Sequence, residues 1–396
     1  MSNEKVNLER FDSWIEDDSD VAALVMRQLL ESVEGRDAIV FPPTFAKPEG
    51  VPRNQWTGYN IDQFDDGTNV CQLDSVGSQA NRMEPIFKED AYKHLVPQIV
   101  VRVPRKTGHV DIHILDAGHR AADAVIRFAA QADNGCDDSV WLGEKLYEAF
   151  NAWQRHGDAE PLARNAPTSC IFGAWDSRST QAKLPRIVRS VVRAYNVREL
   201  TRSAQYNPPL HYVNEGVIEE KYDKGEGDKN PLSQEGFRDN PATRTHGGVE
   251  VRGGIRRDAI INLVALRNLG VVSTNGDISE DLDRRTLELR RYILGLSLVA
   301  LTQRNAQMFN LREGCLLRIS EPDTWEVKLF EGAGGPIAIS HDVALAYATE
   351  AANTFGVQSF DKPFEFEKKK ANEWMSKGEK QRDTLRREGA IVRQGS

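Results

Sequence analysis

Apolar residues recur along the chain with two spacings, and the wider spacing predicts helices. Residues three or four apart are apolar where one face of a helix would be buried, and a capping residue precedes several of these stretches. Asp74 or Ser75 can cap a further helix that runs through Met83. The helices expected on this pattern span 19–33, 119–132, 139–157, 281–305 and 340–356, the last with Ser340 as its cap.

Shorter stretches rich in β-branched residues predict strands, because such side chains fit a pleated surface. Residues 97–104 and 109–116 are expected to pair as a hairpin through the turn "RKTG". Residues 315–330 predict a second hairpin that turns at Glu321–Asp323. Three further strands are expected at 38–45, 169–176 and 186–197, although the arginines of the last also suit a helix face.

Residues 203–249 differ from the rest of the chain. They are rich in Gly, Pro, Asn and Asp and have little periodicity, so they are expected to lack a core and regular elements of their own. Because the stretch is too long for an ordinary connector, we interpret it as a projecting insertion. Residues 259–272 are mostly apolar and are expected to belong to the core again.

Strands and helices mix without the steady alternation of a doubly wound sheet, which indicates an α+β domain with a partly antiparallel sheet. The expected organisation is an acidic N-terminal segment and helix (1–37), two parts of one core (38–202 and 250–360) around the insertion (203–249), and a charged tail (361–396). The tail is expected to form a charged helix or to be disordered.

The composition is that of a packed globular protein. The chain has 396 residues, of which 40% are apolar and 28% charged, and no apolar run approaches the length of a membrane helix. The N-terminus lacks the basic and apolar regions of a secretion signal. Four cysteines without paired spacing favour a reduced cytoplasmic setting over a disulfide framework or zinc ribbon: Cys71, Cys136, Cys170 and Cys315.

The formal net charge is −8, which by itself disfavours nucleic-acid binding. The distribution of charge changes this picture, because seven basic residues lie between Arg178 and Arg202 and only Glu199 opposes them. A second basic group contains Arg252, Arg256 and Arg257. One basic surface on an acidic body is therefore expected.

One stretch suggests a metal site. In "HVDIHILDAGHRAAD", the side chains of His109, Asp111 and His113 would share one face of a strand, and His119 and Asp123 one face of a helix. These residue types are sensible metal ligands, with Asp116 between them. The spacing matches no familiar metallohydrolase, however, and a solvated strand face explains the same pattern, so we predict no metal and no cofactor.

Two other enzyme classes are disfavoured. "SVGSQ" is not the tight turn that carries a serine nucleophile, and neither glycine-rich stretch is followed by the Lys–Ser/Thr of a phosphate loop. The polar stretch "LDSVGSQANRMEP" (73–85) fits a nucleic-acid backbone better, because such side chains near a helix start suit phosphate and sugar. Cations expected beside strand ends or helix starts are Arg82, Arg120, Arg178, Lys183 and Arg186.

Three ordered motifs resemble a known family: "LDSVGSQANRMEP" (73–85), "LDAGHRAADAVIR" (115–127) and "FGAWDSRSTQAKLPR" (172–186). Together with "FPPTFA" (41–46), they are similar to the backbone subunit of type I-G (formerly I-U) CRISPR effector complexes, a member of the RAMP superfamily that forms the Cascade filament. The resemblance covers about Ala38 to Gly356. It implies a modified RNA-recognition-motif (ferredoxin-like) palm with thumb and finger-like insertions.

The resemblance also implies a function. Copies of the subunit would stack head to tail along one CRISPR guide RNA and present its bases for pairing with target DNA in antiviral defence. Such subunits bind and do not cut, so the expected protein is no enzyme. Implied partners are the large subunit, a fused guide-processing subunit and a recruited helicase–nuclease.

On this interpretation the helix near Asp74 presents polar side chains to the guide, and 203–249 is a candidate thumb with Tyr206, His211 and Tyr212 available to stack. The predicted RNA-binding residues are Ser78, Gln79, Asn81, Arg82, His119, Arg120, Arg178, Lys183, Arg186, Arg252, Arg256 and Arg257. The alternative is a metal-dependent hydrolase or nuclease that uses His109, Asp111, His113 and His119.

Overall fold

A large antiparallel sheet forms the centre of the protein in the computed structural model, which describes residues 7–52, 56–131, 140–273, 279–303, 309–358, 360 and 362–387. The strand order across its centre is β1–β14–β11–β4, and every pair is antiparallel. These strands span Val21–Ser32 (β1), Ile255–Asn262 (β14), Val188–Tyr195 (β11) and Asn69–Asp74 (β4). Edge strands are β3 (Ile61–Gln63), β15 (Asn310–Arg312), β16 (Cys315–Ile319), β17 (Thr324–Leu329) and β18 (Pro336–Ile337).

The connections of this sheet are those of a ferredoxin-like domain. Because β1 and β11 both run antiparallel to β14, they are parallel to each other with β14 between them. Helical segments join β1 to β11, and others join β14 to the edge strand beside β1. This split β–α–β arrangement, used twice, is the ferredoxin-like pattern. The α+β fold class predicted from the sequence is confirmed.

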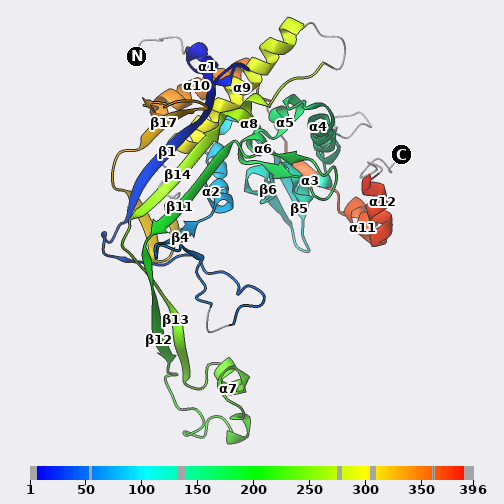
Figure 1. Ribbon diagram of the computed structural model, residues 1–396. Helices are drawn as coiled ribbons and strands as arrows, with labels where there is room; N and C mark the ends of the chain where they lie inside the picture. The colour runs from blue at the N-terminus through cyan, green and yellow to red at the C-terminus, as the bar shows by residue number, and fades with distance from the viewer. Residues whose placement is uncertain are drawn as a thin grey trace.

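Helices cover one face of the sheet (Figure 1). The helix α2 (Val76–Met83) packs on β11, α8 (Leu263–Arg267) packs on β1, and α6 (Pro167–Phe172) lies between β11 and α9. Two long helices, α9 (Ser279–Thr302) and α10 (His341–Phe355), pack on each other. The short α1 (Asp12–Ile15) contacts α8 and α9. Leu24, Met26, Val192 and Ile261 point from the strands into this core.

A second, five-stranded sheet lies beside the first one. Its strands are β5 (Val100–Pro104), β6 (His109–His113), β7 (Ala129–Gln131), β8 (Val140–Trp141) and β19 (Phe364–Phe366). Helices α3 (Ala124–Arg127), α4 (Leu142–His156) and α5 (Glu160–Asn165) pack near it, with the small hairpin β9 (Ala174–Trp175) and β10 (Lys183–Leu184). The chain ends in α11 (Lys368–Ser376) and α12 (Glu379–Arg387), so part of the charged tail is structured.

A long two-stranded ribbon projects from the end of β11 (Figure 1). It consists of β12 (Val197–Tyr206) and β13 (Asn240–Val251), and β2 (Ile39–Val40) pairs with the base of β13. At its far end residues 207–239 fold into a compact tip that contains α7 (Pro231–Gln234). The ribbon and its tip include residues 203–249, the stretch that is interpreted from the sequence as a projecting insertion.

The prediction that this insertion lacks regular elements was wrong. Its prolines and glycines lie mainly in the tip, whereas β12 is continuous. Residues Thr201–Tyr206 are exposed on both faces of the ribbon, so no buried face produces an alternating pattern in the sequence.

Three other predicted elements differ from the structure. Residues 19–33 are strand β1 and not a helix, because Leu24, Met26 and Leu30 alternate toward the core while Val25 and Leu29 are apolar on the opposite face. Residues 169–176, predicted as a strand, begin as helix α6, which is buried on all sides and has no periodicity. The helix predicted at 119–132 is not formed: the described residues 119–131 contain a short turn, α3 and β7, and Arg120 has a positive φ of 51° that no helix continues.

The predicted hairpin at 315–330 is one interrupted edge strand. Both β16 and β17 pair with β1, Leu317 opposite Ser32 and Leu329 opposite Val21. The chain therefore continues along β1 past residues 320–323 and does not reverse there. The polar residues between the two strands mark a local irregularity, which sequence alone does not separate from a turn.

Several predicted elements are confirmed: the hairpin β5–β6, strand β11, and helices α4, α9 and α10. Ser75 caps α2 by accepting a hydrogen bond from the backbone N–H of Ser78 at 3.2 Å, and Ser340 caps α10. Cys71, Cys170 and Cys315 are buried free thiols, while Cys136 lies outside the described residues. Within the described part of the chain, no helix is long and apolar enough to cross a membrane.

A buried polar network joins α2 to the sheet. The guanidinium of Arg257, which is fully buried, donates to Ser190 Oγ and to Gln28 Oε1, both at 2.8 Å. Ser190 in turn donates to Gln79 Oε1 at 2.9 Å, and Gln79 donates to Asp74 Oδ2 at 2.7 Å. Burial lowers the pKa of Arg257 to about 10.

Replacement of Arg257 is expected to destabilise the fold. In Arg257→Met, the buried Gln28 and Ser190 lose their charged partner, which should lower the free energy of unfolding by about 3 kcal/mol. Its neighbour Arg256 lies on the opposite face, so Arg256→Met should change it by less than about 1 kcal/mol. Urea unfolding of both variants checks this, and equal losses would contradict the assignment of Arg257 to the core.

Candidate nucleic-acid interface

The face of the central sheet opposite the helices carries a group of arginines. Side chains alternate along a strand, so the residues that pair across β1, β14 and β11 on this face are neighbours. Arg27 pairs with Asp258, and Arg256 pairs with Arg193. We call the surface formed by Arg27, Arg193, Arg256, Asp258 and Tyr195 the arginine face.

One carboxylate serves all three guanidiniums of the arginine face. Asp258 lies 2.8 Å from Arg256, 3.9 Å from Arg27 and 4.0 Å from Arg193. The three arginine side chains remain 38%, 49% and 31% exposed, respectively. Glu326 on β17 also interacts with Arg27 and forms an ion pair with Lys328. Three arginines and one lysine thus outnumber two carboxylates, and the surface keeps a net positive charge toward solvent. Guanidinium groups match phosphate oxygens with paired hydrogen bonds.

An aromatic ring completes this surface. Tyr195 donates its hydroxyl proton to Asp258 Oδ2 at 3.2 Å and accepts a hydrogen bond from Arg256 Nη2 at 2.9 Å. The Arg256 guanidinium also lies 4.8 Å from the centre of the Tyr195 ring. Burial, and then the charge of Asp258, raise the pKa of Tyr195, so the phenol stays neutral. Aromatic rings beside cations on an open sheet are common where proteins bind single-stranded RNA.

Further cations lead from the sheet onto the ribbon. After Asn196, whose φ is 49°, the chain passes from β11 into β12. Arg198 and Arg202 on β12 are exposed, as are Arg189 on β11 and Arg252 at the end of β13. Arg252 forms an ion pair with Glu250 at 3.0 Å. The positive surface therefore extends from the sheet along the base of the ribbon.

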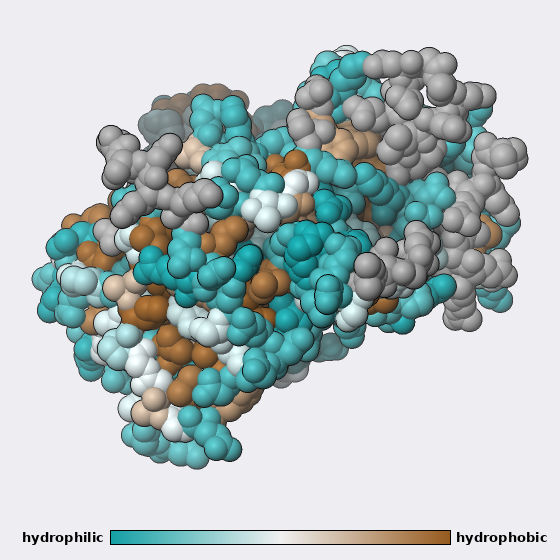
Figure 2. All heavy atoms as spheres, turned by 90° about the horizontal axis from the view of Figure 1, so that it is seen from above, coloured by the Kyte–Doolittle hydropathy of each residue, from teal (hydrophilic) through white to brown (hydrophobic). Residues whose placement is uncertain are grey.

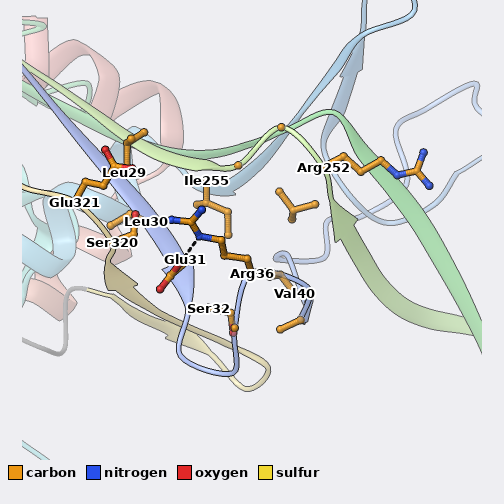
Figure 3. Close-up of a pocket in the computed structure, with 15 residues that line it drawn as sticks. Leu29, Leu30, Glu31, Ser32, Arg36, Val40, Arg252, Ile255, Ser320 and Glu321 are labelled. Atoms are coloured by element: carbon orange, nitrogen blue, oxygen red, sulfur yellow. Dashed lines mark hydrogen bonds and ion pairs between the residues drawn. The ribbon is translucent and has the colours of Figure 1, made fainter.

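A pocket of about 350 Å³ opens where the ribbon leaves the sheet (Figure 3). The end of β1, the glycine turn between β13 and β14, and the break between β16 and β17 form its walls. Leu29, which lines it, pairs with Arg256, so the pocket adjoins the arginine face. Arg36 donates to Glu31 at 3.0 Å on its polar side. The space beside Gly254 in this wall is open, since a Cβ added there would meet no atom within 4 Å.

Four of the predicted RNA-binding residues form internal bonds. Gln79 and Arg257 belong to the buried network, and Arg120 is 6% exposed, so these three are corrected to framework residues with no access to a ligand. Arg82 donates to Asp74 at 3.0 Å and to the carbonyls of Asn310 and Leu311, which ties α2 to β15. Because side chains alternate along a strand, the neighbours Arg256 and Arg257 point to opposite faces of β14.

The three motifs that carry the family resemblance meet at Arg120. Its guanidinium donates to Glu84 at 2.7 Å, to Asn81 Oδ1 at 3.4 Å and to the carbonyl of Gly173 at 3.3 Å. Burial raises the pKa of Glu84. Burial and the nearby Arg120 lower the pKa of Arg186.

Of the remaining predicted residues, Arg256 belongs to the arginine face, and the others reach the surface outside it. Ser78 is half-buried, and Asn81, His119, Arg178, Lys183, Arg186 and Arg252 are exposed. Asn81 and Ser78 belong to α2, which covers the other side of the sheet. The prediction thus combined two surfaces. The predicted set lacks Arg27, Arg193 and Tyr195. A signal for two of them was present, because Arg189, Arg193 and Tyr195 are separated by even numbers of residues, which places them on one face of a strand.

The side chains of the alternative, metal-binding interpretation have other partners. Asp111 forms two hydrogen bonds with Arg102, both at 2.9 Å. His113 accepts from the backbone of Leu115 and contacts Gln98, and burial lowers its pKa to about 4. Among the residues that the structure describes, no group of three or more His, Cys, Asp or Glu side chains could hold a metal ion.

Residues 24–199, less than half of the chain, match the family model described as CRISPR-associated protein GSU0053. The match supports a CRISPR-associated protein. It begins in β1 and ends in the first residues of β12, so it includes all three motifs and Arg27, Arg193 and Tyr195. It does not include Arg256, Asp258 or the tip of the ribbon. No curated protein matches the chain.

The metal content of the protein tests the alternative interpretation. Purified protein should contain zinc and manganese only at background, because Asp111 is paired with Arg102 and His113 is held by internal hydrogen bonds. Elemental analysis by mass spectrometry measures this. A stoichiometric metal that disappears in the double variant His109→Ala with His113→Ala would support the hydrolase alternative.

Proposed function

We propose that this protein binds the backbone of a CRISPR guide RNA through the arginine face and assembles in several copies along it. The guide then presents its bases to target DNA in antiviral defence. The role is binding and not catalysis, in the reducing cytoplasm, as one backbone subunit of a type I-G Cascade complex of the RAMP superfamily. The large subunit, the guide-processing subunit and the helicase–nuclease are its further partners.

The observation that carries this proposal is the excess of positive charge on an open sheet face. Arg27, Arg193 and Arg256 surround one carboxylate, and the face continues into the cations of the ribbon. Contacts of this type bind phosphate without reading bases, which suits a protein that must accept any guide sequence. The family match to CRISPR-associated proteins supplies the biological setting.

The acidic net charge of −8 is compatible with this function. Seen from above, the surface is largely hydrophilic with smaller hydrophobic areas (Figure 2). Binding depends on the local potential at the contact surface, because salt screens charges more than about 8–10 Å away. A net acidic protein can therefore still bind RNA through the basic arginine face.

Removal of two cations tests the proposal. Arg27→Ala with Arg193→Ala should weaken binding to unrelated RNA sequences equally, by about tenfold to a hundredfold. The slope of log K against log salt should fall by about 1.4, as expected for two lost contacts to a single strand. Fluorescence anisotropy at several salt concentrations measures both quantities.

A matched control removes the same charge elsewhere. Lys93 and Arg284 are exposed cations with acidic neighbours. Both lie on the helical side of the sheet, Arg284 on α9 and Lys93 in a short turn that contacts α10. Lys93→Ala with Arg284→Ala should leave the affinity and the salt slope close to those of the wild type. Equal losses in both double variants, or a loss confined to one RNA sequence, would refute backbone binding by the arginine face.

A further inference from the structure

The tip of the ribbon has a chemistry opposite to that of its base. Residues 207–239 contain eight acidic and four basic side chains, a formal net charge of −4. Large apolar side chains are exposed among them: Val217 is 62% exposed and Tyr222 50%. Such a surface repels phosphate, so the tip is unsuited to RNA and suited to a basic protein surface with some apolar area.

The tip is a built unit with its own small nucleus. Asn230 is fully buried, and its amide donates to Asp223 at 2.6 Å and to the carbonyl of Gly225 at 3.1 Å. The side-chain oxygen Oδ1 of Asn230 accepts a hydrogen bond from the backbone N–H of Leu232, which is also buried. The rings of Tyr212 and Phe237 meet edge to face at 5.0 Å. A surface held in this way loses less conformational entropy on docking.

The chain carries a complementary surface on its C-terminal helices. Residues 368–387, which form α11 and α12, contain eight basic and three acidic side chains, a formal net charge of +5. Trp374 anchors α11 in the body, whereas its neighbour Met375 is 64% exposed. Arg382 links the two helices through hydrogen bonds to the carbonyls of Met375 and Lys377. Thioether groups pack favourably against aromatic rings such as those of the tip.

These two surfaces lie far apart on one molecule. The tip is at the end of the ribbon, and α11 and α12 lie on the side of the body (Figure 1). A chain therefore does not bring its own tip to its own C-terminal helices. Two different complementary patches make a head-to-tail contact, which extends into an open filament unless its rotation closes a ring.

We propose that the acidic tip of one copy docks on the basic helices α11–α12 of a second copy of this chain. This inference rests on the proposed function, since it names the contact that joins neighbouring copies along the RNA. Each copy then offers one tip and one pair of helices, and the arginine face remains available to the guide. The contact weakens as salt rises, because exposed charges on both sides contribute to it.

Charge reversal on each surface tests the docking. The tip variant carries Glu215→Lys, Glu220→Lys and Glu226→Lys, and the tail variant carries Lys368→Glu, Lys369→Glu and Lys380→Glu; all six positions are exposed. A control reverses two exposed cations of the β5–β6 turn, Arg105→Glu with Lys106→Glu. Mass photometry counts the copies bound to an RNA long enough for several, and anisotropy measures binding to an RNA that holds one.

The expected pattern is specific to a head-to-tail contact. The tip variant and the tail variant each bind the short RNA but fail to assemble beyond single copies on the long RNA. Their mixture assembles again in alternating copies, because the intact tip meets the intact helices and the reversed tip meets the reversed helices. A chain with all six changes regains complementary charge and assembles again, and the control assembles like the wild type.

Three results would overturn the inference. These are normal assembly of either variant alone, no assembly in the mixture, or no assembly of the chain with all six changes. The mixture is also measured by sedimentation at high protein concentration without RNA, so that pairing is tested even if the wild type binds no RNA. Failure of the wild type to bind the short RNA would refute the proposed function alone.

Discussion

The alternation of side chains along the central strands is the constraint on which the rest of the structure depends. On β14, Arg257 points into the core and Arg256 points to the opposite face. The inward arginine holds α2 to the sheet through Ser190, Gln28 and Gln79. The outward arginine contributes to the positive surface. Two adjacent residues of the same type thus have separate roles, one in the framework and one at the candidate interface.

The sequence predicted the elements with one clearly buried face. Helices α4, α9 and α10 and the hairpin β5–β6 follow from their periodicity and caps. Strand β1 does not, because apolar residues on both faces hide its alternation. The ribbon has the opposite difficulty, since both of its faces are exposed over much of β12. Pairing with distant strands determines both elements, and one sequence carries no direct record of such pairing.

The sequence predicted the residue types of the candidate site better than it predicted which residues lie together. The basic stretch between Arg178 and Arg202 does contribute to the positive surface through Arg193 and its neighbours. The polar motif 73–85 instead supplies internal bonds, with Gln79 and Arg82 both joined to Asp74. Arg27 could not be placed without the register of β1 against β14, which sets it beside Asp258. Spatial grouping of distant cations therefore required the structure.

The most direct test of guide binding by the arginine face is a cross-linking map. The protein is expressed with a CRISPR array, purified with its RNA and irradiated, and the cross-linked peptides and the bound RNA are sequenced. The account predicts guide RNA of uniform length, with cross-links at Tyr195 and in β11, β14 and the base of the ribbon. Cross-links confined to the α2 side of the sheet around Asn81 and Arg186, or no bound RNA, would contradict it.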